Sequence, residues 1–301
     1  MKKSSDLALG SWQFGPSHGF WTGSTTQASR LTISAAYKAG IRHFDTAPAY
    51  GNGLAEQLLG SVLSGKTATI DTKFMPKHPS LVAQDVQKSL DRLKRTSVNT
   101  LYLHWPSSSL DLRPIVESAA GLIEQGKVQS LGLSNTPLSL VQRLHDLPIT
   151  FLQIPCSLLW TRGLEEYKEY AEKQGLSLVG YSPLGLGLLS GNHHHRPNDS
   201  RGNLYVYQDR AYSVFIELLD LLSFLAKEKA LSMAQLALAW ARSQDFTSIL
   251  VGARSPQQLF SLLETDVISL DEGEKRLLDE VAGRLSACAP PSWDNLFGHR
   301  W

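Results

Sequence analysis

The sequence predicts an α/β protein folded as a (β/α)8 TIM barrel, with a lid-like loop after the seventh strand and a C-terminal helix and tail. Three observations lead to this prediction. Short apolar runs rich in β-branched residues alternate with amphipathic segments along the whole chain, which is the pattern of βα units around a parallel sheet. The runs number about eight, as a closed barrel requires. No Gly-x-Gly-x-x-Gly follows the first run, which disfavours a doubly wound sheet.

The expected elements follow one another regularly. The chain has 301 residues, the length of a one-domain barrel, and we expect residues 1–301 to form a single domain. The expected strands are residues 7–15, 41–47, 68–74, 99–105, 128–135, 149–155, 176–183 and 247–253. The expected helices between them are residues 25–39, 54–64, 80–94, 112–125, 139–146, 162–174 and 232–243. Helices commonly end at glycine, and four of these segments do so, at Gly40, Gly65, Gly126 and Gly175.

Two segments lie outside this repeat. Residues 182–210, "SPLGLGLLSGNHHHRPNDSRGNLYVYQDR", form a long insertion after a late strand, where a lid or a ligand-binding loop is typical. A helix-like stretch at residues 270–285 is followed by a tail that ends in "PPSWDNLFGHRW".

Composition excludes several functional classes. A net charge of +1 with 19% charged residues gives no electrostatic reason to expect binding to nucleic acid or to an anionic membrane, so we expect a small-molecule partner. The first residues contain no signal-length apolar stretch, and no apolar run reaches 18 residues, from which we expect a cytoplasmic protein. Cys156 and Cys288 lack the number and spacing of a disulfide framework or a metal site, so we expect them to be inert packing residues.

Polar residues stand at the carboxyl ends of the expected strands, where barrel enzymes place their active sites. Tyr50 lies in the loop after the second strand, and the strand ends carry Asp45, Lys73, His104, Ser134, Asn135, Gln153 and Tyr181. Each of these residues alone has an ordinary structural explanation, such as a turn former or a buried histidine. Together they predict an active site.

The chemistry of four of these residues is specific. Tyrosine is a poor acid at neutral pH, and we expect the ammonium of Lys73 to lower the pKa of Tyr50. Asp45 would keep Lys73 charged, because an unpaired buried ammonium tends to lose its proton. His104 would donate a hydrogen bond to an oxygen beside Tyr50. The set predicts a proton donor for a developing alkoxide.

The chain resembles the aldo-keto reductases over nearly its whole length. The motifs that carry the resemblance are "FDTAPAYGNG" with Glu56 after it, "TKF", "LYLHWP", "GLSN", "LQIPCS", "GYSPLGLGLLSG" and "GARSPQQL". The resemblance implies an NAD(P)H-dependent reductase of aldehydes and ketones in which Asp45, Tyr50, Lys73 and His104 form a catalytic tetrad. "DTAPAYGNG" is also similar to sugar-oxidising members, so oxidation of a sugar-like alcohol is an alternative direction.

The remaining strand-end residues resemble the nicotinamide site of that family. Ser134, Asn135 and Gln153 would bind the carboxamide, and Tyr181 would stack under the ring, because hydride transfer needs a fixed orientation.

Two loops are candidates for the cofactor phosphates. The loop after the seventh strand carries Ser182, Leu184, Gly185, Gly187 and Gly191, and its glycines permit close backbone approach. The loop after the eighth strand, with Gly252, begins a helix whose amides would face an anion.

The cofactor preference depends on the same loop. A 2′-phosphate needs a cation, and Arg254 is the one cation of "GARSPQQL", with Ser255 and Gln258 as further donors. We therefore expect NADPH/NADP+, with NADH as the alternative. The chain reads "FSLLE" where many relatives have a Glu-Asn pair against the adenine.

Aromatic residues predict the substrate wall. We expect Trp12, Phe20, Trp21 and Trp105 to line it, with Trp301 as a further candidate. The run "NHHHR" at residues 192–196 has no acidic or cysteine partner at ligand spacing, so we expect a solvated lid segment and no metal site. The rival function is a cofactor-binding regulatory or sensor subunit on the same barrel, with little turnover.

Overall fold

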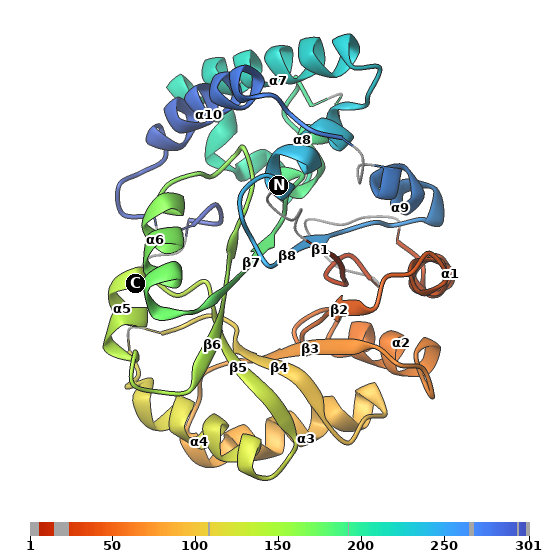
Figure 1. Ribbon diagram of the computed structural model, residues 1–301, viewed down its shortest axis with the longest axis vertical. Helices are drawn as coiled ribbons and strands as arrows, with labels where there is room; N and C mark the ends of the chain where they lie inside the picture. The colour runs from red at the N-terminus through yellow and green to blue at the C-terminus, as the bar shows by residue number, and fades with distance from the viewer. Residues whose placement is uncertain are drawn as a thin grey trace.

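Eight parallel strands form a closed barrel in the computed structural model, which describes residues 6–14, 24–107, 109–191, 193–264, 268–293 and 295–298 (Figure 1). The strands pair in chain order, and β8 closes the sheet against β1. They are β1 (Asp6–Gly10), β2 (His43–Asp45), β3 (Thr69–Phe74), β4 (Val98–Leu103), β5 (Val128–Ser134), β6 (Ile149–Pro155), β7 (Ser177–Tyr181) and β8 (Ser248–Val251). The (β/α)8 barrel expected from the sequence is confirmed.

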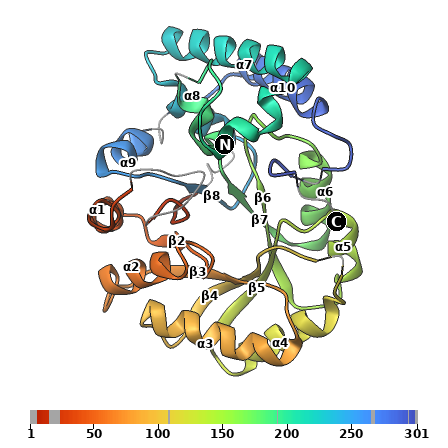
Figure 2. The same cartoon turned by 180° about the vertical axis from the view of Figure 1, so that it is seen from behind.

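Helices surround this barrel in both views (Figures 1 and 2). Those expected from the sequence are α1 (Thr26–Lys38), α2 (Leu54–Val62), α3 (Val82–Leu93), α4 (Arg113–Glu124), α5 (Leu138–Arg143), α6 (Leu164–Gln174), α8 (Met233–Arg242), α9 (Pro256–Leu263) and α10 (Glu272–Ala287). A 3-10 turn, η1 (Pro79–Leu81), precedes α3. None of the helices in the described ranges has both the length and the apolar character needed to cross a membrane.

Gly40, Gly126 and Gly175 follow their helices directly as the sequence predicts, whereas Gly65 lies in the turn beyond α2, whose C-cap is Leu63. Gly40, Gly65, Gly126 and Gly175 have φ values of 97°, 69°, 69° and 68°, in the left-handed region that disfavours other residues. A Cβ at any of these positions would meet no atom within 4 Å. The backbone conformation, rather than lack of space, therefore selects glycine there.

One long helix was not expected. Helix α7 (Asp209–Glu228) follows the insertion and packs beside α10, as both ribbon views show (Figures 1 and 2). Its buried residues recur every three or four positions, at Ala211, Phe215, Leu218, Leu219, Leu222, Leu225 and Ala226. This spacing is the period of an amphipathic helix, so the signal was present in the sequence. The expected alternation of strands and helices assigned no element to residues 211–231.

The expected lid is partly packed against the protein. The insertion contains three 3-10 turns, η2 (Gly185–Ser190), η3 (Ser200–Asn203) and η4 (Tyr205–Tyr207). Leu186, Leu188, Leu204 and Val206 are buried, and the hydroxyl of buried Tyr205 donates to the carbonyl of Leu159 at 2.5 Å. The end of the insertion that carries η3 and η4 is thus anchored to the core.

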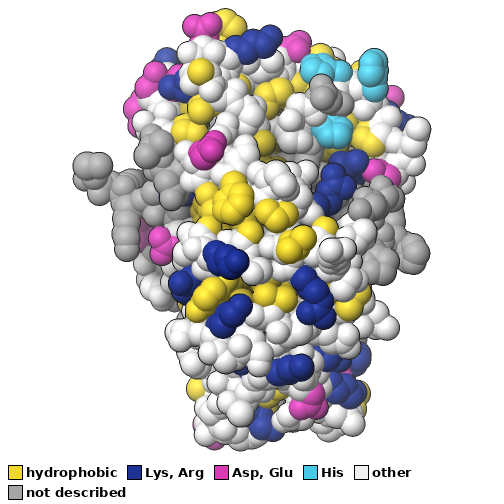
Figure 3. Space-filling view, turned by 90° about the vertical axis from the view of Figure 1, so that its right-hand side faces the viewer, with side chains coloured by type: hydrophobic (Ala, Val, Ile, Leu, Met, Phe, Trp, Pro, Cys, Tyr) yellow, Lys and Arg dark blue, Asp and Glu magenta, His cyan; other side chains and the backbone are white. Residues whose placement is uncertain are grey.

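The outer surface carries mixed side chains. On the face in Figure 3, basic, acidic and hydrophobic groups are interspersed, and histidine side chains gather in its upper part. The barrel interior, in contrast, holds a buried ion pair, which belongs to the site described next.

Candidate active site

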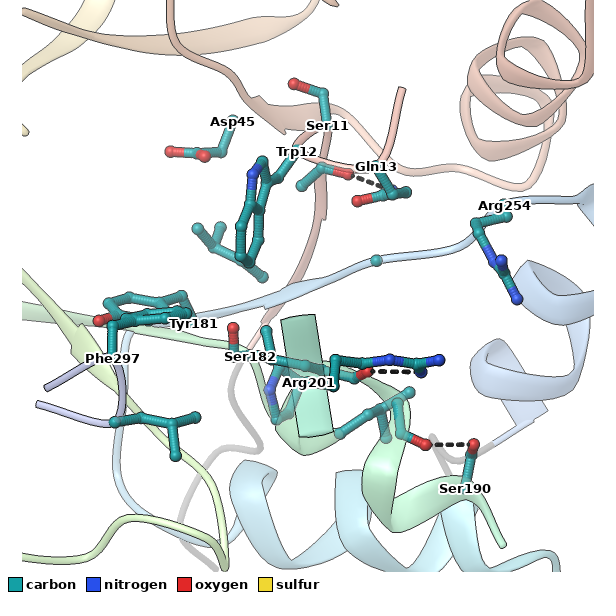
Figure 4. A pocket seen from close by; sticks show the side chains of 18 of the residues that line it. Ser11, Trp12, Gln13, Asp45, Tyr181, Ser182, Ser190, Arg201, Arg254 and Phe297 are labelled. Carbon is teal, nitrogen blue, oxygen red and sulfur yellow. Dashed lines mark hydrogen bonds between the residues drawn. The ribbon is translucent and has the colours of Figure 1, made fainter. Parts of the chain in front are cut away.

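A cavity of about 1090 Å³ opens at the carboxyl ends of the strands (Figure 4). Asp45, Tyr181 and Phe297 lie at one end of it, and Arg201, Arg254 and Ser190 lie at the other. The cavity is thus elongated, with an aromatic end and a basic end. This volume slightly exceeds the usual range for a small-molecule site, about 300–1,000 Å³.

Asp45 and Lys73 form an ion pair inside the barrel. Asp45 ends β2 and Lys73 is in β3, and both are 2% exposed. The Lys73 Nζ donates to Asp45 Oδ1 at 2.5 Å and to the carbonyl of Thr46 at 2.8 Å. Gln153 Nε2 donates to Asp45 Oδ2 at 2.9 Å. Asp45 lines the cavity, whereas Lys73 lies beneath its wall.

A turn of left-handed residues holds Tyr50 above this pair. Gly51, Asn52 and Gly53 have φ values of 57°, 53° and 85°. A Cβ on Gly53 would lie 2.7 Å from the side chain of Arg92, so only glycine fits there. The Lys73 Nζ lies 5.0 Å from the centroid of the Tyr50 ring.

Glu56 connects the turn to β3. It is fully buried in α2, where its carboxylate accepts from Thr72 Oγ1 at 2.7 Å and from Arg92 Nε at 2.5 Å. Thr72 precedes Lys73 in β3. The buried carboxylate therefore ties the helix after Tyr50 to the strand that carries Lys73.

The expected direction of the Tyr50 pKa is wrong. Burial raises the pKa of the Tyr50 hydroxyl above its ordinary value, and the nearby charge of Asp45 adds to the rise. The charge of Lys73 and a hydrogen bond to it lower the pKa, but by less. The net change is a rise in the pKa because burial removes the hydration that would stabilise the phenolate. The attraction of the Lys73 ammonium compensates for only part of that loss.

His104 stands directly after β4, beside Tyr50. Their ring centroids are 5.6 Å apart, and the planes are nearly perpendicular. Burial, and then the charge of Lys73, hold the pKa of His104 well below its usual value, so its imidazole is neutral at neutral pH. A neutral imidazole keeps one N–H to donate. Within the described residues, His104 Nδ1 has no hydrogen-bond partner.

The candidate carboxamide ligands form a connected network. Asn135 donates to the carbonyl of His104 at 2.9 Å and to Ser134 Oγ at 3.0 Å. Ser134 donates to Gln153 Oε1 at 3.3 Å, and the Tyr181 hydroxyl donates to Asn135 Oδ1. All four residues line the cavity, as expected. Their mutual hydrogen bonds hold the side chains at its wall.

The loop after β7 divides into two groups. Ser182, Leu184 and Gly187 line the cavity. The described lining does not include Gly185 and Gly191, which the sequence placed with them. A Cβ on Gly185 would lie 2.4 Å from the Leu159 side chain, so close packing accounts for that glycine.

The loop after β8 differs from expectation in its hydrogen bonds. Gly252, Arg254 and Gln258 line the cavity, whereas Ser255 does not. Ser255 is the N-cap of α9, and its hydroxyl accepts from the amide of Gln258 at 3.3 Å. The Gln258 side chain accepts from the amide of Arg254 at 2.9 Å. One amide of the first helical turn, that of Gln258, therefore takes part in capping, although the helix amides were expected to face an anion.

The aromatic wall combines residues after β1, after β4 and in the tail. Trp12 and Trp105 line the cavity as expected, while Phe20, Trp21 and Trp301 lie outside the described residues. Sequence reasoning missed the other wall residues from the tail, Trp293, Leu296 and Phe297. It also missed Ser11, Gln13, His193, Arg201, Asn203, Gln257 and Ser261. The aromatic residues of the tail could have indicated a contribution to the wall. Nothing in the sequence distinguishes Arg201 from the other basic residues.

The histidine run shows no ligand cluster. His194 pairs with Asp220 at 3.2 Å, His195 is exposed, and His193 lines the cavity. In the described part of the chain, no three His, Cys, Asp or Glu side chains gather as a metal site requires. Cys156 is fully buried, and burial raises the pKa of its thiol, as expected for an inert residue.

Comparison with known proteins identifies the family. The model of the aldo/keto reductase family matches residues 6–282. The chain belongs to the aldo/keto reductase family. As a member, it is an oxidoreductase of the class that reduces carbonyls or oxidises alcohols.

Individual members of the family are similar over nearly their whole length. The aldo-keto reductase YhdN of Bacillus subtilis (strain 168) is 27% identical, with 93% of this chain and 90% of that protein covered. The NADH-specific methylglyoxal reductase of Escherichia coli (strain K12) is also 27% identical, with 93% and 95% covered. The structure of a glycerol dehydrogenase from Gluconobacter oxydans aligns with a TM-score of 0.82 at 26% identity, covering 95% and 94% of the two chains.

Proposed function

We propose that the protein is an NADPH-dependent reductase of aldehydes and ketones, with Tyr50 as the proton donor. One observation carries the proposal: Asp45 holds Lys73 beneath Tyr50, and His104 stands beside Tyr50 at the aromatic end of the cavity. Oxidation of a sugar-like alcohol is the same chemistry in reverse. Two similar proteins are named for opposite directions, a methylglyoxal reductase and a glycerol dehydrogenase.

The residues of the cavity fit a nicotinamide dinucleotide. Ser11 Oγ is buried in the lining and has no hydrogen-bond partner among the described residues, so it can bind a ligand. Asp45, which Lys73 neutralises, is the one carboxylate in the described lining, while Arg201 and Arg254 supply cations at the far end. An anionic cofactor therefore meets attraction at one end and an apolar wall at the other.

The four residues have complementary roles in reduction. A bound reduced nicotinamide supplies the hydride for the carbonyl carbon. Tyr50 donates the proton to the carbonyl oxygen, and His104 donates a hydrogen bond that stabilises the developing negative charge. Lys73 stabilises the tyrosinate left after proton transfer, and Asp45 keeps Lys73 charged.

Tyr50 is protonated at neutral pH, as reduction requires of its acid, because burial raises the pKa of its hydroxyl above the ordinary value. Oxidation requires the tyrosinate as base, so its rate should increase toward high pH.

A direct assay tests the proposal. The purified protein should consume NADPH when mixed with 4-nitrobenzaldehyde, and Tyr50→Phe should abolish most of that consumption. Lack of turnover over a broad panel of carbonyls and aldoses, tested in both directions with both cofactors, would contradict the proposal. Cofactor binding without turnover would instead favour a regulatory or sensor subunit.

Family membership leaves cofactor choice open, since one relative is named an NADH-specific methylglyoxal reductase. Arg254 is the residue that supports NADPH. It lines the basic end of the cavity, next to the N-terminus of α9, whose partial positive charge adds to its own.

A further inference from the structure

A second charged pair lies next to the Asp45–Lys73 pair, deeper in the barrel. His43 and Asp45 are two positions apart in β2, and Asp71 and Lys73 are two positions apart in β3, so each strand points both side chains to the same face. His43 Nε2 lies 2.6 Å from Asp71 Oδ2. The two pairs are crossed, because β2 supplies the acid of the upper pair and the base of the lower pair.

This crossing places two buried carboxylates side by side. Asp45 and Asp71 are partners in the register of the parallel strands β2 and β3, and each is 2% exposed. Burial raises the pKa of the Asp45 carboxyl, Lys73 opposes this rise, and the charge of Asp71 adds to it. Lys73 carries one positive charge and can balance only one of the two carboxylates. Protonated His43 balances the other.

His43 lies at the amino end of β2, away from the cavity. Its side chain is 24% exposed, its Nδ1 lies 3.4 Å from Ser248 Oγ of β8, and the described lining of the cavity does not include it. Burial lowers the pKa of His43, but the charges of Asp71 (β3), Asp45 (β2) and Asp6 (β1) raise it above its usual value overall. His43 can therefore exchange a proton with solvent while the cavity is filled.

Loss of this proton changes the charge beneath the proton donor. When His43 is protonated, the four side chains of the two pairs carry no net charge, and when it is neutral they carry one negative charge. Tyr102 of β4 cannot compensate, because burial, and then the charges of Asp71 and Asp45, raise its pKa far above the usual value. An added negative charge makes the Tyr50 tyrosinate harder to form, so Tyr50 becomes a weaker acid.

Resting on the function proposed above, we propose that protonated His43 is a positioning residue of the reductase, which neutralises Asp71 and so leaves the charge of Lys73 to act on Tyr50. His43 acts through Asp71 and touches neither the substrate nor the cofactor. Reduction therefore becomes slower when His43 loses its proton, at a pH where Tyr50 itself is still protonated.

The pH profile of a single turnover tests this role. Reduction of 4-nitrobenzaldehyde by the NADPH-loaded protein is followed from about pH 5.5 to about pH 10. His43→Gln, which lacks the proton at every pH, should be about 3- to 10-fold slower than the wild type at the acidic end, equivalent to about 0.7–1.4 kcal/mol. The two rates should become equal at the alkaline end, where the wild type has lost the same proton.

Asp71→Asn tests the same step at the opposite end of the profile. Asn keeps an oxygen that can accept from the Thr100 amide, as Asp71 Oδ1 does at 3.0 Å, but it carries no charge. This variant should be at least as fast as the wild type at the acidic end and about 3- to 10-fold faster at the alkaline end. Either single variant is sufficient if the other does not fold, which thermal unfolding at each pH shows.

The double variant separates charge from packing. His43→Gln combined with Asp71→Asn has no charge at either position, so it should keep the acid-end rate of the wild type over the whole range. A structural role of the pair would instead make the double variant at least as slow as His43→Gln. Ser248→Ala is the matched control, since it removes a neighbour of His43 without changing a charge and should keep the wild-type profile.

A titration without cofactor or substrate gives an independent measurement. The ultraviolet absorbance of tyrosinate is recorded against pH, and the signal of Tyr50 is obtained by subtracting the curve of Tyr50→Phe. In Asp71→Asn, Tyr50 should ionise about 0.5–1 pH unit lower than in the wild type, which corresponds to the same 3- to 10-fold change.

Three outcomes would overturn the inference. Equal rates of His43→Gln and the wild type over the whole range would show that His43 does not act on Tyr50. A double variant as slow as His43→Gln would show that the effect comes from packing. Failure of the wild type to reduce any carbonyl with either cofactor would overturn the proposed function as well, which distinguishes the two failures.

Discussion

The ring of Phe297 lies nearly parallel to that of Tyr181, with 6.5 Å between the ring centroids and 20° between the planes. Tyr181 ends β7, whereas Phe297 belongs to the tail after α10. Arg162 holds the start of this tail by donating to the carbonyls of Ser286 at 2.9 Å and Ala289 at 2.8 Å. The tail therefore closes the aromatic end of the cavity.

The first prediction concerns this wall. Phe297 also makes edge contacts with Trp12 and Trp105, at 5.8 and 5.9 Å between centroids. A contact between the Phe297 ring and the ring of 4-nitrobenzaldehyde should contribute about 0.5–1.5 kcal/mol to substrate binding. Phe297→Ala should therefore raise KM for 4-nitrobenzaldehyde about 3- to 10-fold and change kcat little. Steady-state kinetics measure both constants. Phe224→Ala, which removes a phenylalanine that is 60% exposed, is the control. An unchanged KM would exclude Phe297 from the substrate wall.

The second prediction concerns the proton donor. Tyr50→Phe removes the hydroxyl and keeps the ring, so kcat for reduction should fall by at least about 10²-fold, the scale of general acid catalysis. Cofactor affinity should remain near that of the wild type. Single-turnover reduction and fluorescence titration measure the two effects separately. A variant with most of the wild-type kcat would remove Tyr50 from the mechanism.

The third prediction concerns Lys73. Lys73→Met should lower kcat about as much as Tyr50→Phe, since it removes the charge that stabilises the tyrosinate. It also leaves the buried carboxylate of Asp45 without its cation, which should lower the free energy of unfolding by about 3–5 kcal/mol. Adding Asp45→Asn to Lys73→Met should restore stability but not activity. Urea unfolding would measure the recovered stability, and steady-state kinetics would measure the activity. Recovery of activity in the double variant would contradict the prediction.

The fourth prediction concerns cofactor choice. The wild type should prefer NADPH, and Arg254→Ala should weaken NADPH by about 10- to 150-fold, or roughly 1.5–3 kcal/mol, with little effect on NADH. Fluorescence titration of both proteins with both cofactors measures the difference. Equal losses, or a wild type that already prefers NADH, would show that Arg254 does not bind the 2′-phosphate.

The fifth prediction concerns the stability contributed by His43, which begins β2 at the end opposite Asp45. His43 Nε2 lies 2.6 Å from Asp71 Oδ2. Burial lowers the pKa of His43, but the charge and hydrogen bond of Asp71, with smaller contributions from Asp45 and Asp6, raise it above its ordinary value overall. The folded protein therefore binds this proton more tightly than the unfolded chain does.

The resulting stabilisation is fully present below the unfolded pKa of about 6.5 and is lost as pH rises through the higher folded pKa. His43→Gln should lower the free energy of unfolding by about 1–3 kcal/mol under acidic conditions and by less in alkali. Urea unfolding at about pH 5.5 and about pH 8.5 compares the two, with His145→Gln, at an exposed position, as the control. An equal loss at both pH values would exclude protonation of His43 as the cause.

The sequence alone determined the barrel and the order of its strands, whereas several element ends differ from those expected, such as β1, which ends at Gly10 rather than at residue 15. Alternating strand and helix periods, with glycine at Gly40, Gly65, Gly126 and Gly175, are local signals that depend on neighbouring residues. The carboxyl ends of parallel strands meet at one rim, so Asp45, His104, Ser134 and Tyr181 could be placed together without coordinates. The sequence of helix α7 has the spacing of apolar residues that is typical of an amphipathic helix. It was not predicted because one helix was expected after each strand.

Tertiary structure decided how these residues interact. The pKa of Tyr50 depends on the balance between burial and the charge of Lys73, and no spacing in the sequence measures that balance. Only folding brings Phe297 from the tail onto Tyr181 and Arg201 from the insertion beside Gly187. These contacts join segments far apart in the chain, and their geometry is set by the packing of the elements between them rather than by the residues themselves.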